Sequence, residues 1–206
     1  MAPPYNVLIT GSTKGIGYAL ARKFLKAGDN VVICSRSAER VESVANDLKK
    51  EFGEQHVGLS VMLEKALVDF ARDKLEYIDI WINNAGSNAY SYKPLVETSD
   101  EALMFAAYGA TKRSVVHLTK SLQPGMVTTD LLMSGATAKQ AKFFINILAE
   151  TADVVADYLV PNIREIPTKQ SMKPTYIRFL TGLKAYSRIF SRIAFGARRN
   201  KYVAED

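Results

Sequence analysis

Residues 6–17 read NVLITGSTKGIG and contain two patterns that together predict a local fold. Asn6 to Thr10 form a short, β-branched apolar run suited to a buried parallel strand. Beyond the glycine-rich turn, apolar residues recur every three or four positions and predict a helix with one apolar face. These helix positions are Ile16, Ala19, Leu20, Phe24 and Ala27. The stretch therefore predicts a strand, a tight turn and a helix.

The glycines of this turn fit a phosphate-binding role. Gly11 allows the tight turn, Gly15 lets the backbone approach a pyrophosphate, and Gly17 lets helix and strand pack closely. The helix N-terminus adds free N–H groups and a partial positive charge. We therefore predict a dinucleotide site, the alternative being a tight turn without ligand. The candidate residues are Gly11, Ser12, Thr13, Lys14, Gly15, Ile16 and Gly17.

The end of the second predicted strand, Asn30 to Cys34, indicates which dinucleotide is bound. An NAD-specific site places Asp or Glu there for the ribose 2′-hydroxyl, whereas this chain continues with Ser35 and Arg36. Arg36 can pair with a 2′-phosphate, and Lys14 can reach the same group. The sequence thus favours NADPH over NADH. The alternative is two surface cations that flank the turn.

The rest of the chain continues the alternation of strands and helices. We predict helices at residues 38–52, 63–75, 105–123, 138–148 and 152–163, and strands at 56–62 and 78–83. Such alternation is typical of a parallel sheet with helices on both faces. We expect an α/β fold, a Rossmann-like doubly wound sheet, in a single domain over residues 1–206.

Composition narrows the class of protein. The 206 residues are 48% apolar, and no apolar run reaches the ~18 residues of a membrane span. A single cysteine, Cys34, excludes an internal disulfide, and two distant histidines give no metal cluster. No targeting segment is recognisable ahead of the first strand.

The C-terminal segment, residues 173–206, is basic and amphipathic. On a helical wheel Arg178, Lys184, Arg188 and Arg192 lie opposite Phe179, Leu183, Tyr186, Ile189, Phe190 and Ile193. Such a helix suits peripheral contact with a membrane interface. The alternatives are a helix covering the domain or a dimer partner, and a final strand at residues 175–181. The segment lacks a nucleic-acid-binding module, so we expect no nucleic-acid partner.

Tyr108 and Lys112 lie four residues apart on a predicted helix and so share one face. A free tyrosine has a pKa of about 10 and transfers its proton reluctantly. A nearby ammonium group favours the phenolate. The pair could therefore protonate a carbonyl oxygen while hydride reaches the carbon. The pattern Tyr-x-x-x-Lys is common by chance. Its interpretation as a catalytic pair depends on the predicted phosphate-binding turn earlier in the chain.

These motifs carry a resemblance to a known family. The glycine turn, Asn83-Asn84-Ala85-Gly86, the Tyr108/Lys112 pair and Pro124-Gly125 resemble a short-chain dehydrogenase/reductase of the classical type. Within that family, longer stretches are similar to plant chlorophyll(ide) b reductases, including Lys173 to Gly182. The match covers nearly the whole chain.

The resemblance implies a substrate, a place and site residues. The substrate would be chlorophyll b or chlorophyllide b, whose 7-formyl group is reduced with NADPH at the thylakoid membrane of the chloroplast, as the first step of chlorophyll b degradation. Tyr108 would donate the proton, and Lys112 would lower its pKa and hold the nicotinamide ribose. Asn84, Ala85 and Gly86 would shape the adenine side. The cofactor-binding set would also include Pro124 and Gly125. A related reductase subunit or a homo-oligomer is an expected partner.

The chain also departs from the family. Only 21 residues separate Gly86 from Tyr108, too few for the family's helix, strand and second helix. The family's catalytic serine position corresponds to Leu95, and the nearby Ser99 has the wrong spacing. Two further gaps appear: no strand precedes Pro124-Gly125, and no aspartate follows residues 57–62.

Because each gap interrupts an otherwise close match, we predict omitted segments and a sheet that lacks two central strands. The expected consequence is a badly impaired or inactive enzyme that still holds NADPH weakly. The alternative function is a non-catalytic variant that binds a dinucleotide or a partner.

Overall fold

The computed structural model describes residues 2–61, 73, 75–86, 121–134, 136, 138–169 and 176–205. Most of the predicted helix at 63–75 and most of the predicted helix at 105–123 lie outside these residues. Tyr108 and Lys112 also lie outside them, and so do Leu95 and Ser99.

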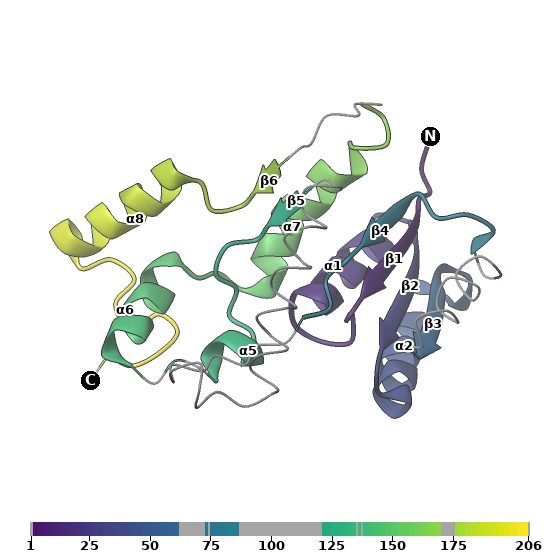
Figure 1. Ribbon diagram of the computed structural model, residues 1–206, viewed down its shortest axis with the longest axis horizontal. Helices are drawn as coiled ribbons and strands as arrows, with labels where there is room; N and C mark the ends of the chain where they lie inside the picture. Colours follow the sequence, from purple (N-terminus) through teal and green to yellow (C-terminus); the bar gives the residue numbers. More distant parts are fainter. Residues whose placement is uncertain are drawn as a thin grey trace, which may run out of the picture.

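The N-terminal part is a parallel α/β sheet (Figure 1). Its elements are β1 (Asn6–Thr10), α1 (Gly15–Lys26), β2 (Asn30–Ser35), α2 (Ala38–Phe52), a 3₁₀ turn (Glu54–His56), β3 (Val57–Val61) and β4 (Ile80–Ile82). The strand order is β3-β2-β1-β4, with every pair parallel. Ile9 of β1 lies opposite Ile33 on one side and Ile82 on the other. The sequence-based expectation of a Rossmann-like parallel sheet is confirmed.

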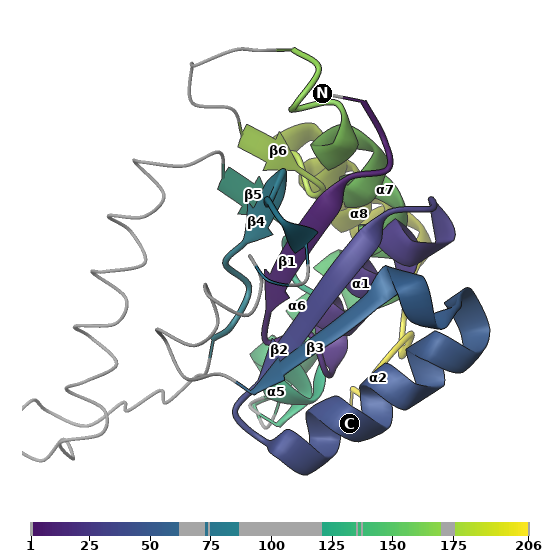
Figure 2. The ribbon, with the colours of Figure 1, turned by 90° about the vertical axis from the view of Figure 1, so that its right-hand side faces the viewer.

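Alternation along the strands divides the sheet into two faces. Val7 and Ile9 point to the face that α1, α2 and α7 (Ala152–Arg164) cover, and Figure 2 shows these helices on one side of the sheet. Leu8 and Val32 are fully buried on the opposite face. Because both faces are buried, the strands read as continuous apolar runs, as expected for a parallel sheet.

Local signals set the helix ends. The Ser37 side chain accepts a hydrogen bond from the Arg40 backbone N–H and begins α2. Gly53, with φ of 95°, follows its last residue. Helix α1 contributes fully buried Phe24 to the core, where loss of the ring would cost about 3–5 kcal/mol.

The C-terminal part contains a second, smaller sheet. Its elements are β5 (Ser121–Gln123), α5 (Asp130–Met133), α6 (Lys139–Leu148), α7, β6 (Tyr176–Arg178) and α8 (Gly182–Phe195). Strands β5 and β6 pair in parallel, Leu122 opposite Ile177. Among the described residues, no strand pairing joins this pair to β4.

Two sequence-based predictions are decided here. The predicted helix at 105–123 is wrong for its last three residues, because Ser121–Gln123 pair with Tyr176–Arg178 as a strand. A strand therefore does precede Pro124-Gly125, against expectation. The pairing supplies backbone hydrogen bonds to a distant strand, and a local helical pattern gives no information about such a partner. The alternative of a final strand within 175–181 is confirmed, so Arg178 lies outside the C-terminal helix.

Helix α7 is fixed to the sheet by a buried ion pair. Asp29, at the start of β2 and fully buried, accepts a hydrogen bond from the Tyr5 backbone N–H at 3.0 Å. Arg164, in the last turn of α7, donates to Asp29 Oδ1 at 3.1 Å, and its Nε lies 2.9 Å from Oδ2. These contacts hold the end of α7 against the N-terminal edge of the sheet.

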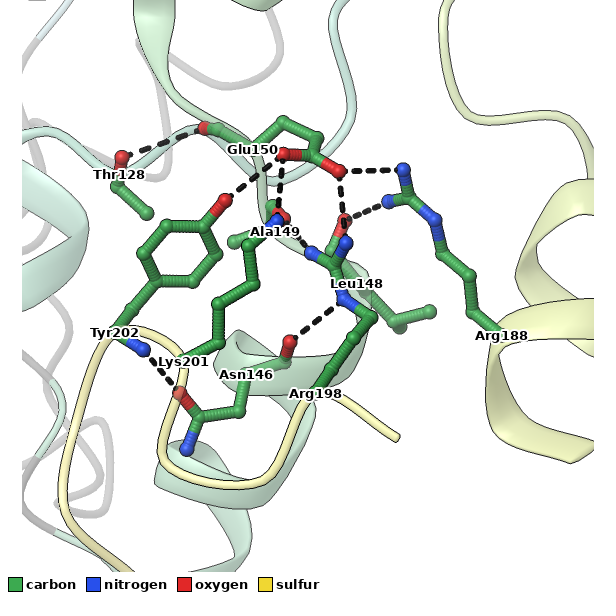
Figure 3. Close-up of polar contacts among 9 residues, drawn as sticks. All are labelled: Thr128, Asn146, Leu148, Ala149, Glu150, Arg188, Arg198, Lys201 and Tyr202. Carbon is green, nitrogen blue, oxygen red and sulfur yellow. Dashed lines mark hydrogen bonds and ion pairs between the residues drawn. The ribbon is translucent and has the colours of Figure 1, made fainter. Parts of the chain in front are cut away.

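The C-terminal segment is held through Glu150, which is 8% exposed (Figure 3). Its backbone pairs with the segment after Pro124-Gly125: the Thr128 N–H donates to its carbonyl, and its own N–H donates to the Met126 carbonyl. Its carboxylate accepts four bonds from the C-terminal segment. These come from Arg188 at 2.6 Å, Tyr202 at 2.8 Å, Arg198 at 2.9 Å and Lys201 at 3.2 Å.

A second polar side chain, that of Asn146, also binds the C-terminal segment. Its side-chain oxygen accepts from the backbone N–H groups of Tyr202 and Val203 at 2.7 and 3.0 Å. Its amide donates to Glu205 and to the Val203 carbonyl. Glu205 in turn pairs with Arg192 of α8. The C-terminal residues are therefore tied to the end of α6.

The Glu150 contacts set its pKa. Burial raises the pKa, but hydrogen bonds from Tyr202, Arg198 and Lys201 outweigh it and lower the pKa from 4.5 to about 2. A lowered carboxylate pKa contributes stability that is fully present above the unfolded-state value. That contribution is lost as the pH falls from about 4.5 to about 2.

We predict that Glu150→Gln destabilises the fold by about 3 kcal/mol, because three cations lose their buried carboxylate. Urea unfolding at neutral pH measures the change. The free energy of unfolding of the variant should also lose part of its dependence on pH between about 4.5 and 2. Glu42→Gln, at an exposed position of α2, is the matched control. Equal effects of the two substitutions would contradict this role of Glu150.

Candidate functional site

A cavity of about 510 Å³ opens where the carboxyl ends of β1, β2 and β4 meet the N-terminus of α1. The residues that line it are Gly11, Thr13, Lys14, Gly15, Ile16, Ser35, Arg36, Ser37, Arg40, Asn84, Ala85, Gly86, Thr129, Asp130 and Leu131. The volume lies in the range of cofactor pockets. In an open parallel sheet, ligands bind at this edge because neighbouring turns diverge there.

The turn after β1 is held by hydrogen bonds to β4. Thr10 Oγ1 accepts from the backbone N–H groups of Asn84 and Ala85 at 3.0 and 2.9 Å. The Asn84 amide donates to the carbonyls of Thr10 and Gly11 at 3.0 and 3.1 Å. Asn84 thus fixes the shape of the turn as well as lining the cavity.

Two glycines of the turn have no room for a side chain. Gly11 has a φ of +65°, and a Cβ there would lie 2.9 Å from Ala85 Cα. A Cβ on Gly17 would lie 2.4 Å from Asn84 Nδ2 and 2.5 Å from the Gly11 carbonyl oxygen. These approaches bring the start of α1 against β4. They leave a backbone cradle beside the helix N-terminus, which fits a pyrophosphate.

Three cations line the cavity. Arg36 and Arg40 flank the start of α2, and Lys14 lies in the glycine turn. None of the three forms an ion pair with another residue in the described part of the chain. Unpaired guanidinium and ammonium groups beside a phosphate cradle fit a further anionic group such as a 2′-phosphate. The donor set therefore suits a phosphorylated dinucleotide.

The structure separates the predicted site residues into three groups. Ten line the cavity: Gly11, Thr13, Lys14, Gly15, Ile16, Ser35, Arg36, Asn84, Ala85 and Gly86. Four do not: Ser12, Gly17, Pro124 and Gly125. Tyr108 and Lys112 lie outside the described residues, so their catalytic roles stay predictions.

Ser12 and Gly125 have structural contacts in place of a position on the cavity wall. Ser12 is fully buried: its hydroxyl donates to the Ile9 carbonyl at 2.7 Å and accepts from the Cys34 N–H at 3.0 Å. The hydroxyl therefore fastens the turn to β1 and β2. Gly125, with φ of +76°, packs against Leu180.

Sequence reasoning missed Ser37, Arg40, Thr129, Asp130 and Leu131 as lining residues. Arg40 had a usable signal, because it follows Arg36 by four residues at the first turn of a predicted helix. Thr129 had none, because its place depends on the bridge between Val127 and Glu150. Among the described residues, no group of His, Cys, Asp or Glu is arranged to hold a metal ion.

Comparison with known proteins gives the family. The profile described as short chain dehydrogenase matches residues 5–104. The chain is 68% identical to the rice (Oryza sativa subsp. japonica) protein named chlorophyll(ide) b reductase NOL, chloroplastic, over 100% of this chain and 80% of that protein. This chain belongs to the short-chain dehydrogenase family. The Arabidopsis thaliana protein of the same name is 57% identical over 100% of this chain and 78% of the relative.

Solved structures agree with the fold. An actinorhodin polyketide ketoreductase structure with NADPH aligns with a TM-score of 0.69 at 18% identity, over 86% of this chain and 98% of the other. The L-sorbose reductase of Gluconobacter frateurii aligns with a TM-score of 0.67 at 19% identity, over 84% and 95% of the two chains. At these identities the likeness concerns the fold alone.

The rice alignment also reveals internal gaps. It spans 274 positions and includes all of this chain, which has 206 residues. The difference means that 68 positions lie opposite gaps in this chain. A strand and its flanking helices fit within that length. The predicted shortening relative to plant chlorophyll(ide) b reductases therefore agrees with the alignment.

We predict that Gly17→Ala weakens NADPH binding by about tenfold or more, because the new methyl group would push Asn84 and the turn apart. Overpacking of this kind costs about 1–3 kcal/mol. Titration of NADPH fluorescence measures the affinity. Gly182→Ala is the control, since nothing lies within 4 Å of a Cβ there. Unchanged binding by the Gly17 variant would show that the cavity is not the dinucleotide site.

Proposed function

We propose that this chain is an NADPH-dependent reductase that converts the 7-formyl group of chlorophyll b, or of chlorophyllide b, to a hydroxymethyl group. The observation that carries the proposal is the match, over the whole of this chain, to two plant proteins named chlorophyll(ide) b reductase, at 68% and 57% identity. Binding of NADPH is supported by the cavity, which is lined by the glycine turn and by three cations.

In this proposal the described residues bind the cofactor. The turn at Gly11 and Gly15 and the N-terminus of α1 hold the pyrophosphate. Arg36, Arg40 and Lys14 neutralise the 2′-phosphate, which distinguishes NADPH from NADH. Bound NADPH supplies the hydride that reaches the formyl carbon.

Proton transfer falls to Tyr108 and Lys112 in this proposal. As hydride adds to the carbon, the carbonyl oxygen gains negative charge and needs a proton. The Tyr108 hydroxyl supplies that proton, and the Lys112 ammonium favours the phenolate left behind. The spacing of four residues supports the pairing.

A second candidate function is binding of the dinucleotide, or of a partner reductase, without catalysis. Two observations favour it: the 68 alignment positions that lie opposite gaps, and the absence of strand pairing between β4 and β5 among the described residues. By the spacing argument, Leu95, which has no hydroxyl, stands at the family's catalytic serine position. Loss of one group that stabilises an oxyanion lowers rates by about 10²–10³ in other enzymes.

The names of both plant relatives place them in the chloroplast. We extend that location to this chain and propose the thylakoid membrane as its site of action, because the pigment substrate is lipophilic. A homo-oligomer or a related reductase subunit is the proposed protein partner. No helix in the described ranges is long and apolar enough to cross a bilayer.

The preference for NADPH over NADH is testable by substitution of the two arginines that line the cavity. We predict that the double variant Arg36→Ala/Arg40→Ala binds NADPH about tenfold or more weakly, while its affinity for NADH changes little, because only NADPH carries the 2′-phosphate. Fluorescence titration with each nucleotide measures both affinities. Arg22→Ala, whose side chain pairs with Glu51 on the surface, is the control. Equal losses for the two nucleotides would contradict this role.

Catalysis is testable at the phenol. We predict that Tyr108→Phe lowers reduction of chlorophyllide b by about 10²–10⁴, the usual contribution of a positioned acid, with little change in NADPH affinity. Tyr158→Phe, at a partly exposed phenol of α7, is the control. Pigment turnover, followed by absorbance, and nucleotide binding are measured together. A wild-type chain that binds NADPH but turns over no pigment would favour the second candidate function.

A further inference from the structure

Helix α8 turns its apolar face to solvent. Leu183, Tyr186, Phe190 and Ile193 recur at spacings of three, four and three residues, so they form one stripe along the helix. These four side chains and Phe195 are between 65% and 83% exposed. Ser187 and Ala194 lie next to these residues on the helical wheel, so the stripe carries no charge. A continuous apolar face of this size marks an interaction surface.

The cationic face of α8 is directed inward. Arg188 binds Glu150 and the Leu148 carbonyl, and Arg192 binds Glu205, with side chains only 15% and 9% exposed. Lys184 lies over the Phe179 ring at 3.8 Å. The basic face therefore attaches α8 to the protein. The apolar face is the side left for a partner.

The positive charge around α8 indicates which kind of partner can bind its apolar face. No Asp or Glu occurs between Tyr176 and Ala204. The cations in that range are Arg178, Lys184, Arg188, Arg192, Arg198, Arg199 and Lys201. Glu150 and Glu205 neutralise only part of this charge, and α6 adds Lys139 and Lys142. A second copy packed on the same face would bring like charges together, whereas an anionic lipid surface would attract them.

We propose that α8 lies flat in the interface of an anionic lipid bilayer. Leu183, Tyr186, Phe190, Ile193 and Phe195 enter the boundary between headgroups and acyl chains. Exposed cations of the C-terminal segment, Arg199 among them, meet the lipid phosphates. At 14 residues the helix is about 21 Å long, which suits a helix in the plane of the interface. The inference concerns α8 alone and does not depend on the proposed reaction.

Vesicle co-sedimentation tests the proposal with the full chain. The vesicles contain phosphatidylcholine alone or phosphatidylcholine mixed with phosphatidylglycerol. We expect binding to the mixed vesicles, weakened by added salt, and about a hundredfold loss of partitioning in Phe190→Ser/Ile193→Ser, because each large side chain contributes about tenfold. Val154→Ser, at an exposed apolar position of α7, is the matched control and should bind like the wild type.

A direct readout of insertion accompanies the binding assay. In Phe190→Trp, the new indole should shift its emission to the blue and become quenchable by brominated lipid, relative to the wild type, whose one tryptophan is Trp81. Wild-type binding by the double serine variant, or an unshifted emission of the introduced indole on bound vesicles, would overturn the proposal. A dimer in sedimentation velocity that the same variant dissociates would assign the face to a second copy and overturn it as well. Nucleotide titration of each variant keeps these outcomes separate from failure of the reductase proposal.

Discussion

The cross-link between Thr10 and Asn84 is the contact on which the rest of the site depends. One hydroxyl accepts two backbone N–H groups of the β4 end, and one amide returns two hydrogen bonds to the β1 end. Each such bond contributes about 1 kcal/mol, and each partner left unpaired in this half-buried place costs more. Because Gly17 packs against the same amide, helix α1 can begin at the cradle only if this cross-link forms. The strand ends, the turn and the helix N-terminus therefore form one unit.

That unit is built entirely from the N-terminal part of the chain. All its bonds join β1, β2, β4 and the turn between β1 and α1, which come from the first 86 residues. The departures from the family pattern that the sequence shows lie later in the chain or just after β3, away from these contacts. By contrast, the proposed proton donor Tyr108 and its partner Lys112 come after β4 in the sequence. Binding of the dinucleotide and the proposed proton transfer therefore depend on different parts of the chain.

How far the sequence predicts the structure depends on whether an element is determined locally. The strand, turn and helix at residues 6–26 follow from periodicity and glycine spacing. The predicted helix at 38–52 coincides with α2, whose ends are set locally by Ser37 and Gly53. The segment Ser121–Gln123 is different: it belongs to a helical pattern, yet its partner lies more than fifty residues away. The orientation of α8 was also unpredictable, because amphipathicity gives two faces but not which one a buried Glu150 will attract. Ser12 shows the same limit in a motif, since its hydroxyl binds the backbone rather than facing the cavity.

Glu150 connects the C-terminal segment to the residues after Pro124-Gly125, a contact that the sequence did not predict. Its carboxylate holds α8 and the C-terminal residues, and its backbone holds Met126 and Thr128. The next residue, Thr129, lines the cavity and caps α5. Few covalent and hydrogen bonds therefore separate the helix with the apolar face from the wall of the dinucleotide cavity. The C-terminal segment has no acidic residue before Glu205, so the inward orientation of Arg188 depends on this carboxylate from another part of the chain, whereas Arg192 pairs with Glu205. The orientation of α8 therefore depends on the side chain of Glu150, and the position of Thr129 in the cavity wall depends on the backbone of the same residue.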